Sequence, residues 1–214
     1  MIGFWKKDLF ILRKYMRTYA LILVVYAVLG ISGTWGSSLM TTMISFVTLM
    51  CPLTAFSFDQ ATRWDGYACS LPDGGRGAVA GRYLYTLTIW LAAIGMCCVL
   101  STVLWVTGLQ ESSLMEQLLG NLASGAVGLL MVSITLPMCY KFGVERGRVL
   151  MTVLCLFVFL GIMGGIWMIE GPIPEDVDVV TILNVGMAIF VAVTLVGFYV
   201  SYRVSRAIYL KKEW

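Results

Sequence analysis

Long apolar runs without a charged residue constrain the fold of this chain more than any other feature. Hydrophobic residues fill 59% of the 214 positions and charged residues only 13%, a balance typical of membrane-embedded proteins. A bilayer core requires about 20 apolar residues per helical span, so the first uncharged run, 18–58, is long enough for two spans. The later runs are 83–110, 117–140, 149–169 and 179–202. We therefore predict an all-α integral membrane protein with six transmembrane helices.

The predicted organisation is one membrane domain preceded by a short amphipathic segment. Residues 1–18 are expected to form an interfacial helix, and residues 19–214 the transmembrane domain. The six spans are expected at about 19–36, 39–58, 83–108, 120–140, 149–169 and 180–202. The polar loop 59–82 is the longest one away from the chain ends, which makes it the first candidate for contact with a soluble partner.

The basic residues orient this predicted topology. All fifteen Lys and Arg residues fall on one side, at the two chain ends and in the loops 59–82 and 141–148. The opposite side has no basic residue and holds six acids, which are Glu111, Glu116, Glu170, Glu175, Asp176 and Asp178. Because basic residues concentrate on the cytoplasmic side of membrane proteins, both termini and the loop 59–82 are predicted to be cytoplasmic.

The first eighteen residues have the spacing of an amphipathic helix lying in the membrane interface. The apolar residues that share one face are Trp5, Leu9, Leu12 and Met16, and the basic residues on other faces are Lys6, Arg13 and Arg17. The alternative is an ordinary basic flank that only fixes the topology. An apolar run of spanning length follows, with no clear small-residue cleavage site, so we expect the segment to be retained.

Two prolines and a glycine pair mark positions where the predicted spans can bend. Pro52 lies within the second span and Pro137 near the cytoplasmic end of the fourth. Proline kinks a helix unless neighbours satisfy the carbonyl that it frees. Gly161 and Gly165 form a Gly-x-x-x-Gly pattern in the fifth span. This pattern indicates either a weak or broken helix near the outer face or close helix packing.

The residues that membrane enzymes and ion-coupled transporters use are missing. The chain has no His, which excludes His-based zinc sites and Ser-His triads. No Asp, Glu, Lys or Arg lies inside a predicted span, where a coupling ion would be bound. The phosphate-binding sequence Gly-x-x-x-x-Gly-Lys-Ser/Thr is also absent. We therefore predict no catalytic, metal or cofactor site on this chain, and active transport would take its energy from another polypeptide.

The loop between the second and third spans is predicted to form a helix–turn–helix elbow. Residues 59–71 are expected to continue the second span as a helix, and Pro72 with the following residues 73–75 then imposes a turn. The residues expected to share one face of this helix are Ala61, Trp64, Ala68 and Leu71. Exposed Trp64 and Tyr67 beside charged residues favour a protein interface. The alternative is an aromatic belt resting on lipid headgroups.

Two short stretches resemble a known family. Residues 63–72, RWDGYACSLP, and residues 79–84, VAGRYL, are similar to the signature of the type 2 ATP-binding-cassette (ABC) export permeases. The most similar branch is the short six-span proteins of Gram-positive bacteria that resemble the membrane subunit of phenol-soluble modulin and bacteriocin-immunity exporters, whose N-terminus resembles residues 7–15. The chain departs from the pattern at residues 73–76, DGGR, where the family has a small hydroxyl residue and a base after the proline.

The resemblance implies a multi-pass permease of the bacterial cytoplasmic (plasma) membrane that works as two permease chains, identical or paralogous, with two soluble ABC ATPase subunits. ATP and Mg²⁺ would bind the ATPase, and no nucleic acid is involved. The loop 59–82 would act as the coupling helix. The residues that would contact the ATPase are Arg63, Trp64, Asp65, Tyr67, Ser70, Leu71 and Pro72.

The leading functional hypothesis is an exporter of amphipathic or hydrophobic peptides, such as toxins or antimicrobial peptides, because an uncharged path suits such cargo better than ions or sugars. Lipids or drugs fit nearly as well. The alternative from another class is a non-transporting membrane scaffold or sensor that binds a cytoplasmic partner through the same elbow. An intramembrane protease is disfavoured because no catalytic pair or metal set is present.

Overall fold

The computed structural model describes residues 2–31, 38–71, 74–108, 113–168 and 179–211. These residues form seven helices and no strand. The helices are α1 (Ile2–Ile31), α2 (Ser38–Ala61), α3 (Trp64–Ser70), α4 (Gly74–Val106), α5 (Leu114–Phe142), α6 (Val144–Met168) and α7 (Val179–Lys211). The all-α prediction is therefore confirmed for the described residues.

Four of the helices are long and apolar enough to cross a membrane within the described residues. These segments are Thr42–Ala61, Gly74–Val106, Leu114–Phe142 and Val185–Lys211. They coincide with the second, third, fourth and sixth predicted spans. The first and fifth predicted spans fall on α1 and α6, and parts of both lie outside the described residues. Six spans in total therefore stay a prediction.

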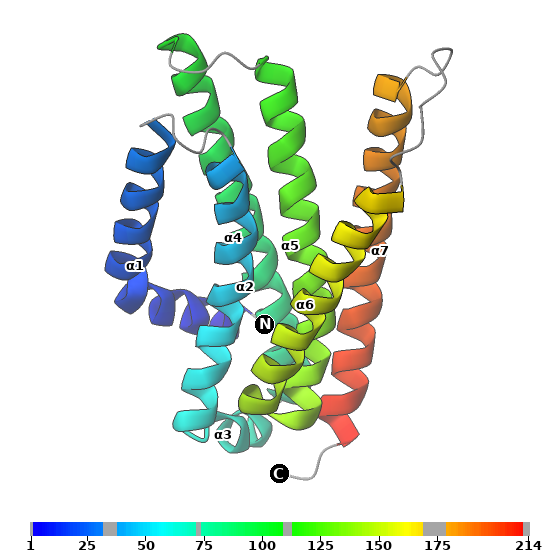
Figure 1. Cartoon of the computed structure of the whole chain (residues 1–214). Coiled ribbons are helices and arrows are strands. Elements are labelled where there is room, and N and C mark those ends of the chain that lie inside the picture. Colours follow the sequence, from blue (N-terminus) through cyan, green and yellow to red (C-terminus); the bar gives the residue numbers. More distant parts are fainter. Residues whose placement is uncertain (1, 32–37, 72–73, 109–112, 169–178, 212–214) are drawn as a thin grey trace.

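The first helix combines two of the predicted elements. Helix α1 is continuous from residue 2 to residue 31, so the helix does not end at the predicted boundary after residue 18. Its direction does change: the first part of α1 lies crosswise to the other helices, and the later part runs alongside them (Figure 1). The crosswise part is the segment that the sequence predicts to lie in the membrane interface, and that location is a prediction that the fold leaves open.

Helix α5 is the centre of the bundle and packs against α2, α4, α6 and α7. Its approach to α2 is close because a Cβ atom at Gly128 would lie 2.9 Å from the Cα atom of Ser45. The Ser45 hydroxyl uses this proximity to donate to the carbonyl of Ser124 over 2.6 Å. Small residues that bring backbones together are a common way to associate helices in lipid, where burial of apolar surface gives little driving force.

One end of the bundle carries the elbow. Helix α3 lies there, at the end of the molecule where α7 also ends, whereas α4 ends and α5 begins at the opposite end (Figure 1). The core near the elbow is rich in aromatic rings from different helices, including Phe56, Tyr140 and Tyr209. Tyr140 packs edge-on against both Phe56 and Tyr209, with ring centroids 4.8 and 5.5 Å apart. These ring contacts join α2, α5 and α7 at the end of the bundle where the elbow lies.

The carbonyl freed by Pro137 has a substitute hydrogen-bond donor. Proline has no N–H group, so the carbonyl of Ser133, four residues earlier in α5, loses its helical partner. The Ser201 hydroxyl of α7 donates to that carbonyl over 2.5 Å, and the Tyr83 hydroxyl of α4 lies 2.7 Å from both Ser201 Oγ and Ser205 Oγ. Pro137 is thus the position where α4, α5 and α7 are joined by polar contacts.

The other predicted bending positions are Pro52, Gly161 and Gly165, and their surroundings differ from those of Pro137. Pro52 is fully buried inside α2. Helix α6 continues through Gly161 and Gly165 to residue 168, so the reading of a broken helix is wrong for the described part of the fifth span. A Cβ atom at Gly161 would have no neighbour within 4 Å among the described residues, so packing within that part of the chain does not require a glycine here.

We expect Ser201→Ala to destabilise the protein by about 1–3 kcal/mol, because it leaves the buried Ser133 carbonyl without a donor. In a Pro137→Ala background the residue 137 N–H can donate to that carbonyl, so the same Ser201 change should cost much less. Thermal unfolding of the purified single and double variants in one detergent measures this difference. Equal losses in the two backgrounds would contradict the role assigned to Ser201.

Candidate functional site

The elbow begins with a break in the helix. Helix α2 ends at Ala61, and Arg63 adopts a left-handed conformation with φ 51° and ψ 36° before α3 starts. The prediction of one continuous helix over 59–71 is therefore wrong. The sequence has no glycine at this position to signal the break, and a non-glycine residue in this conformation costs about 1–3 kcal/mol. The left-handed backbone at Arg63 turns α3 away from the axis of α2.

The elbow ends in a tight turn. The Leu71 N–H donates to the Ala68 carbonyl over 3.3 Å, and the Gly74 N–H donates to the Leu71 carbonyl over 2.8 Å. A Cβ atom at Gly74 would lie only 1.7 Å from the Ala68 carbonyl oxygen. The start of α4 can therefore approach α3 only because residue 74 has no side chain. Pro72 and Asp73, which the sequence places in this turn, lie outside the described residues.

We expect Gly74→Ala to displace α3 and to destabilise the protein by about 1–3 kcal/mol, because a backbone oxygen cannot yield as a flexible side chain can. Gly66→Ala is the matched control: it lies within α3, and its new Cβ atom would have no neighbour within 4 Å in the part of the chain that the structure describes. Thermal unfolding, together with limited proteolysis at the elbow, distinguishes the two variants. Similar behaviour of both would show that the close approach at residue 74 is unimportant.

The two aromatic residues of the elbow have different surroundings. Tyr67 is 57% exposed, as predicted, whereas Trp64 is half-buried, which corrects the prediction that both rings are exposed. The Lys7 ammonium lies 4.8 Å from the centroid of the Trp64 ring, and the centroids of the Trp64 and Tyr67 rings are 5.1 Å apart. The Lys7–Trp64 contact therefore links α3 to α1, and Tyr67 is the more exposed of the two rings.

The remaining predicted contact residues are spread around the elbow. Arg63 and Ser70 are exposed, Leu71 is half-buried, and the Ser70 hydroxyl donates to the Tyr67 carbonyl over 2.8 Å. The side chain of Asp65 and the whole of Pro72 lie outside the described residues. Among the described members of the predicted set, the exposed ones on or next to α3 are Arg63, Tyr67 and Ser70.

Three buried charged side chains and the half-buried Lys7 form a cluster behind the elbow. Asp8 comes from α1, Asp59 from the end of α2 and Arg82 from α4, and they are 2%, 6% and 4% exposed. Arg82 pairs with both carboxylates: its Nη2 atom contacts Asp59 Oδ2, and its Nη1 atom lies 3.1 Å from Asp8 Oδ2. Lys7 Nζ lies 2.5 Å from Asp59 Oδ1 and 3.2 Å from Asp8 Oδ1. The two negative and two positive charges thus give the cluster a formal net charge of zero.

The cluster is held together by charge more than by ideal hydrogen-bond geometry. Arg82 Nη1 and Asp8 Oδ1 are buried and are close to opposite charges, yet neither makes an aligned hydrogen bond among the described residues. Burial raises the pKa of Asp8 above its usual value, although Arg82 and Lys7 pull it down. The Arg82 guanidinium also lies 4.6 Å from the centroid of the Phe56 ring. Arg82 is therefore the residue on which the cluster depends.

The end of α2, where the elbow begins, also makes hydrogen bonds with α6. The Val144 N–H at the start of α6 donates to Gln60 Oε1 over 3.4 Å, and Arg148 Nη2 donates to Ser57 Oγ over 2.7 Å. The end of α2 is consequently fixed to α1, α4 and α6 at once. Movement of α3 would thus be passed to three other helices through charged and polar contacts.

Comparison with known proteins identifies the family. Residues 3–210 match the family model described as ABC-2 family transporter protein. The chain belongs to the ABC-2 transporter family. No curated protein matches the chain, and no solved structure matches it either. Family membership makes this ABC-2 protein a multi-pass permease subunit of an ABC transporter, a transport subunit whose partner is an ABC ATPase.

Sequence signals are weaker for the charged cluster of this ABC-2 permease than for its elbow. Asp8 is the only acid among the basic residues of the N-terminal segment, and Asp59 follows an uncharged run directly. Isolated acids of this kind are candidates for burial with a base, but sequence spacing does not reveal that Arg82 lies between them. The resemblance to the phenol-soluble modulin branch, which concerns the elbow residues and residues 7–15, stays a prediction.

Proposed function

We propose that this ABC-2 permease is the membrane subunit of an ATP-driven exporter of amphipathic or hydrophobic peptides, and that its partner ATPase binds the elbow between α2 and α4. The observation that carries the proposal is the arrangement of α3. Tyr67 is exposed at the tip of the elbow, while Trp64 and Ala68 face inward and fix its position. Exposed aromatic rings on a rigid support are common anchors of protein interfaces.

The contacts around α3 provide a route for the mechanical step. When the ATPase pair closes on ATP, it would push α3 toward the membrane. Lys7 contacts the Trp64 ring and also pairs with Asp8 and Asp59, so displacement of α3 would reach α1 and α2 directly. Arg82 would carry the same displacement into α4. The elbow and the charged cluster would then move together and transmit the displacement to α1, α2 and α4.

The cargo proposal rests on the chemistry of the bundle. The predicted spans contain no charged side chain. Between α5 and α7 lies a hollow of about 410 Å³ whose wall is mostly apolar, with three hydroxyl-bearing residues, Ser133, Thr194 and Ser201. Such a surface suits a chain with one apolar and one weakly polar face. It offers no counter-ion for a charged solute, which would be costly to hold at this depth. Lipids and drugs share the apolar part of this chemistry.

The test is export measured in cells. The permease and its ATPase are expressed in a strain sensitive to amphipathic helical peptides, and survival is scored across a peptide panel. The expected result is raised tolerance that disappears when the phosphate-loop lysine of the ATPase is replaced. If the permease and ATPase co-purify but tolerance to every peptide is unchanged, the cargo is not peptide, and fluorescent lipids and hydrophobic drugs are tested next.

A further inference from the structure

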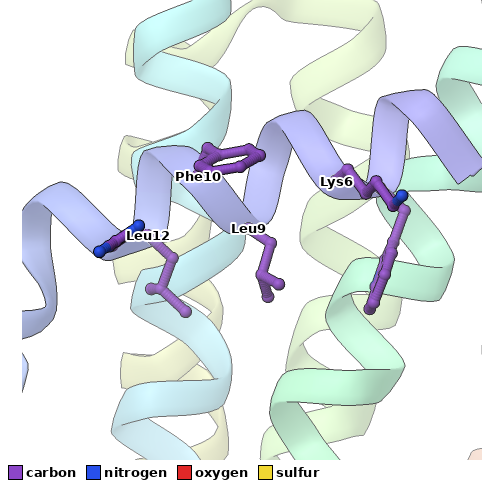
Figure 2. A pocket seen from close by; sticks show the side chains of 6 residues that line it. Lys6, Leu9, Phe10 and Leu12 are labelled. Carbon is purple, nitrogen blue, oxygen red and sulfur yellow. The ribbon is translucent and has the colours of Figure 1, made fainter.

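The crosswise part of α1 has apolar residues that contact the core and others that are exposed. Trp5 and Leu12 pack toward a core cluster of α2 and α4, and Trp5 Nε1 donates to Thr88 Oγ1 over 3.3 Å. Leu9 and Phe10 are 40% and 68% exposed. Leu9 and Leu12 project from the same side of the helix, and Phe10 from another side (Figure 2). Trp5 and Leu12 therefore contact the core, whereas Leu9 and Phe10 leave apolar surface exposed on two sides of the helix.

The exposed surface of this segment also carries a stripe of positive charge. Lys6, Arg13 and Arg17 are spaced by seven and four residues, which places them on one side of a helix with 3.6 residues per turn. All three are exposed. Lys6 and Arg13 make no ion pair or hydrogen bond within the described residues. The nearby acids Asp8 and Asp59 are buried in the ion cluster, so nothing in the described chain neutralises this stripe.

The charges and the apolar residues line one hollow. It has a volume of about 600 Å³, and the residues around it are Trp5, Lys6, Leu9, Phe10, Leu12 and Arg13 (Figure 2). An occupant that satisfies this lining needs an anionic group for the two bases and an apolar chain for the rings and leucines. We propose that the hollow is a binding site for an anionic phospholipid, with its phosphate between Lys6 and Arg13 and an acyl chain against Leu9 and Phe10.

The mixed basic and apolar lining of the hollow favours an anionic lipid over other anions. A free phosphate would pair with the bases but would leave Leu9 and Phe10 in contact with water. A zwitterionic lipid would cover the apolar residues but bring its own positive charge next to Lys6 and Arg13. Amphipathic helices with basic residues bind anionic lipid surfaces by this combination of apolar burial and charge. Because Asp8 and Trp5 tie the segment to α4, bound lipid would also brace the ion cluster behind the elbow.

The test is lipid binding to the full-length permease purified in a neutral detergent. Phosphatidylglycerol and phosphatidylcholine with identical acyl chains are added, and bound lipids are counted by native mass spectrometry. We expect selective retention of phosphatidylglycerol. The double variant Lys6→Gln, Arg13→Gln should weaken it about thirtyfold, since each basic residue near a membrane surface contributes about fivefold in binding. The swap Lys6→Arg, Arg13→Lys should retain it.

The matched control removes two charges elsewhere. Arg203 and Arg206 line a separate hollow on α7, and Arg203→Gln, Arg206→Gln makes the same change in net charge. This variant should lose less than threefold of the binding. Equal losses in both double variants would mean general surface attraction and would overturn the proposal. So would equal binding of the two lipids, or displacement of phosphatidylglycerol by millimolar inorganic phosphate.

Discussion

Replacement of Arg82 by Met is expected to destabilise the permease by about 3–5 kcal/mol, the usual cost of removing one partner from a buried ion pair. Arg82 contacts both Asp8 and Asp59, and its loss leaves two buried carboxylates with only Lys7 to neutralise them. The pKa of Asp8 is already raised by burial. Without Arg82 it should rise further, so that Asp8 takes up a proton. Unfolding in mixed detergent micelles measures the loss.

Two further variants separate the electrostatic cause from simple damage to the core. Arg76→Met removes an exposed arginine from the same helix and should change stability by less than about 0.5 kcal/mol. The triple variant Asp8→Asn, Asp59→Asn, Arg82→Met removes the uncompensated charges and should recover part of the loss. If the triple variant is as unstable as Arg82→Met alone, packing of the long side chain, and not charge, explains the effect.

The apolar runs predicted the helices well because span length is set by the bilayer and by local composition. Helices long and apolar enough to cross a membrane overlap the second, third, fourth and sixth predicted spans. The elbow was predicted as a helix followed by a turn, and the structure has both. The break at Arg63 was missed, since left-handed backbone at a non-glycine residue results from tertiary contacts and not from local propensity.

The cluster behind the elbow could not be predicted, because its members are far apart in the sequence. Lys7 and Asp8 meet Asp59 only because the crosswise part of α1 lies against the ends of α2 and α4. The exposure of Trp64 was misjudged for the same reason: the ring is covered by Lys7, a residue from another helix. Sequence patterns give the faces of single helices, but not which charged side chain another helix brings to them.

Tyr67→Ala is expected to weaken binding of the partner ATPase about thirtyfold or more, equivalent to about 2 kcal/mol, the lower limit for an interface anchor. Tyr67 is the most exposed large hydrophobic residue of the elbow at 57%, and its backbone is fixed by α3. Truncation removes contact area without affecting the buried cluster. The permease alone should therefore keep its thermal stability while co-purification and transport-stimulated ATP hydrolysis fall together.

Two comparisons make this outcome specific to the elbow. Tyr199→Ala removes an equally exposed tyrosine, 61%, from the membrane-spanning helix α7, and it should leave ATPase binding unchanged. Trp64→Ala removes the ring that Lys7 covers, so it should lower both ATPase binding and the stability of the permease. This expected difference follows from the two environments: Trp64 is half-buried and contacts Lys7, whereas Tyr67 is exposed and is the proposed anchor for the partner. Full ATPase binding by Tyr67→Ala would show that the partner docks elsewhere and that α3 is only a structural turn.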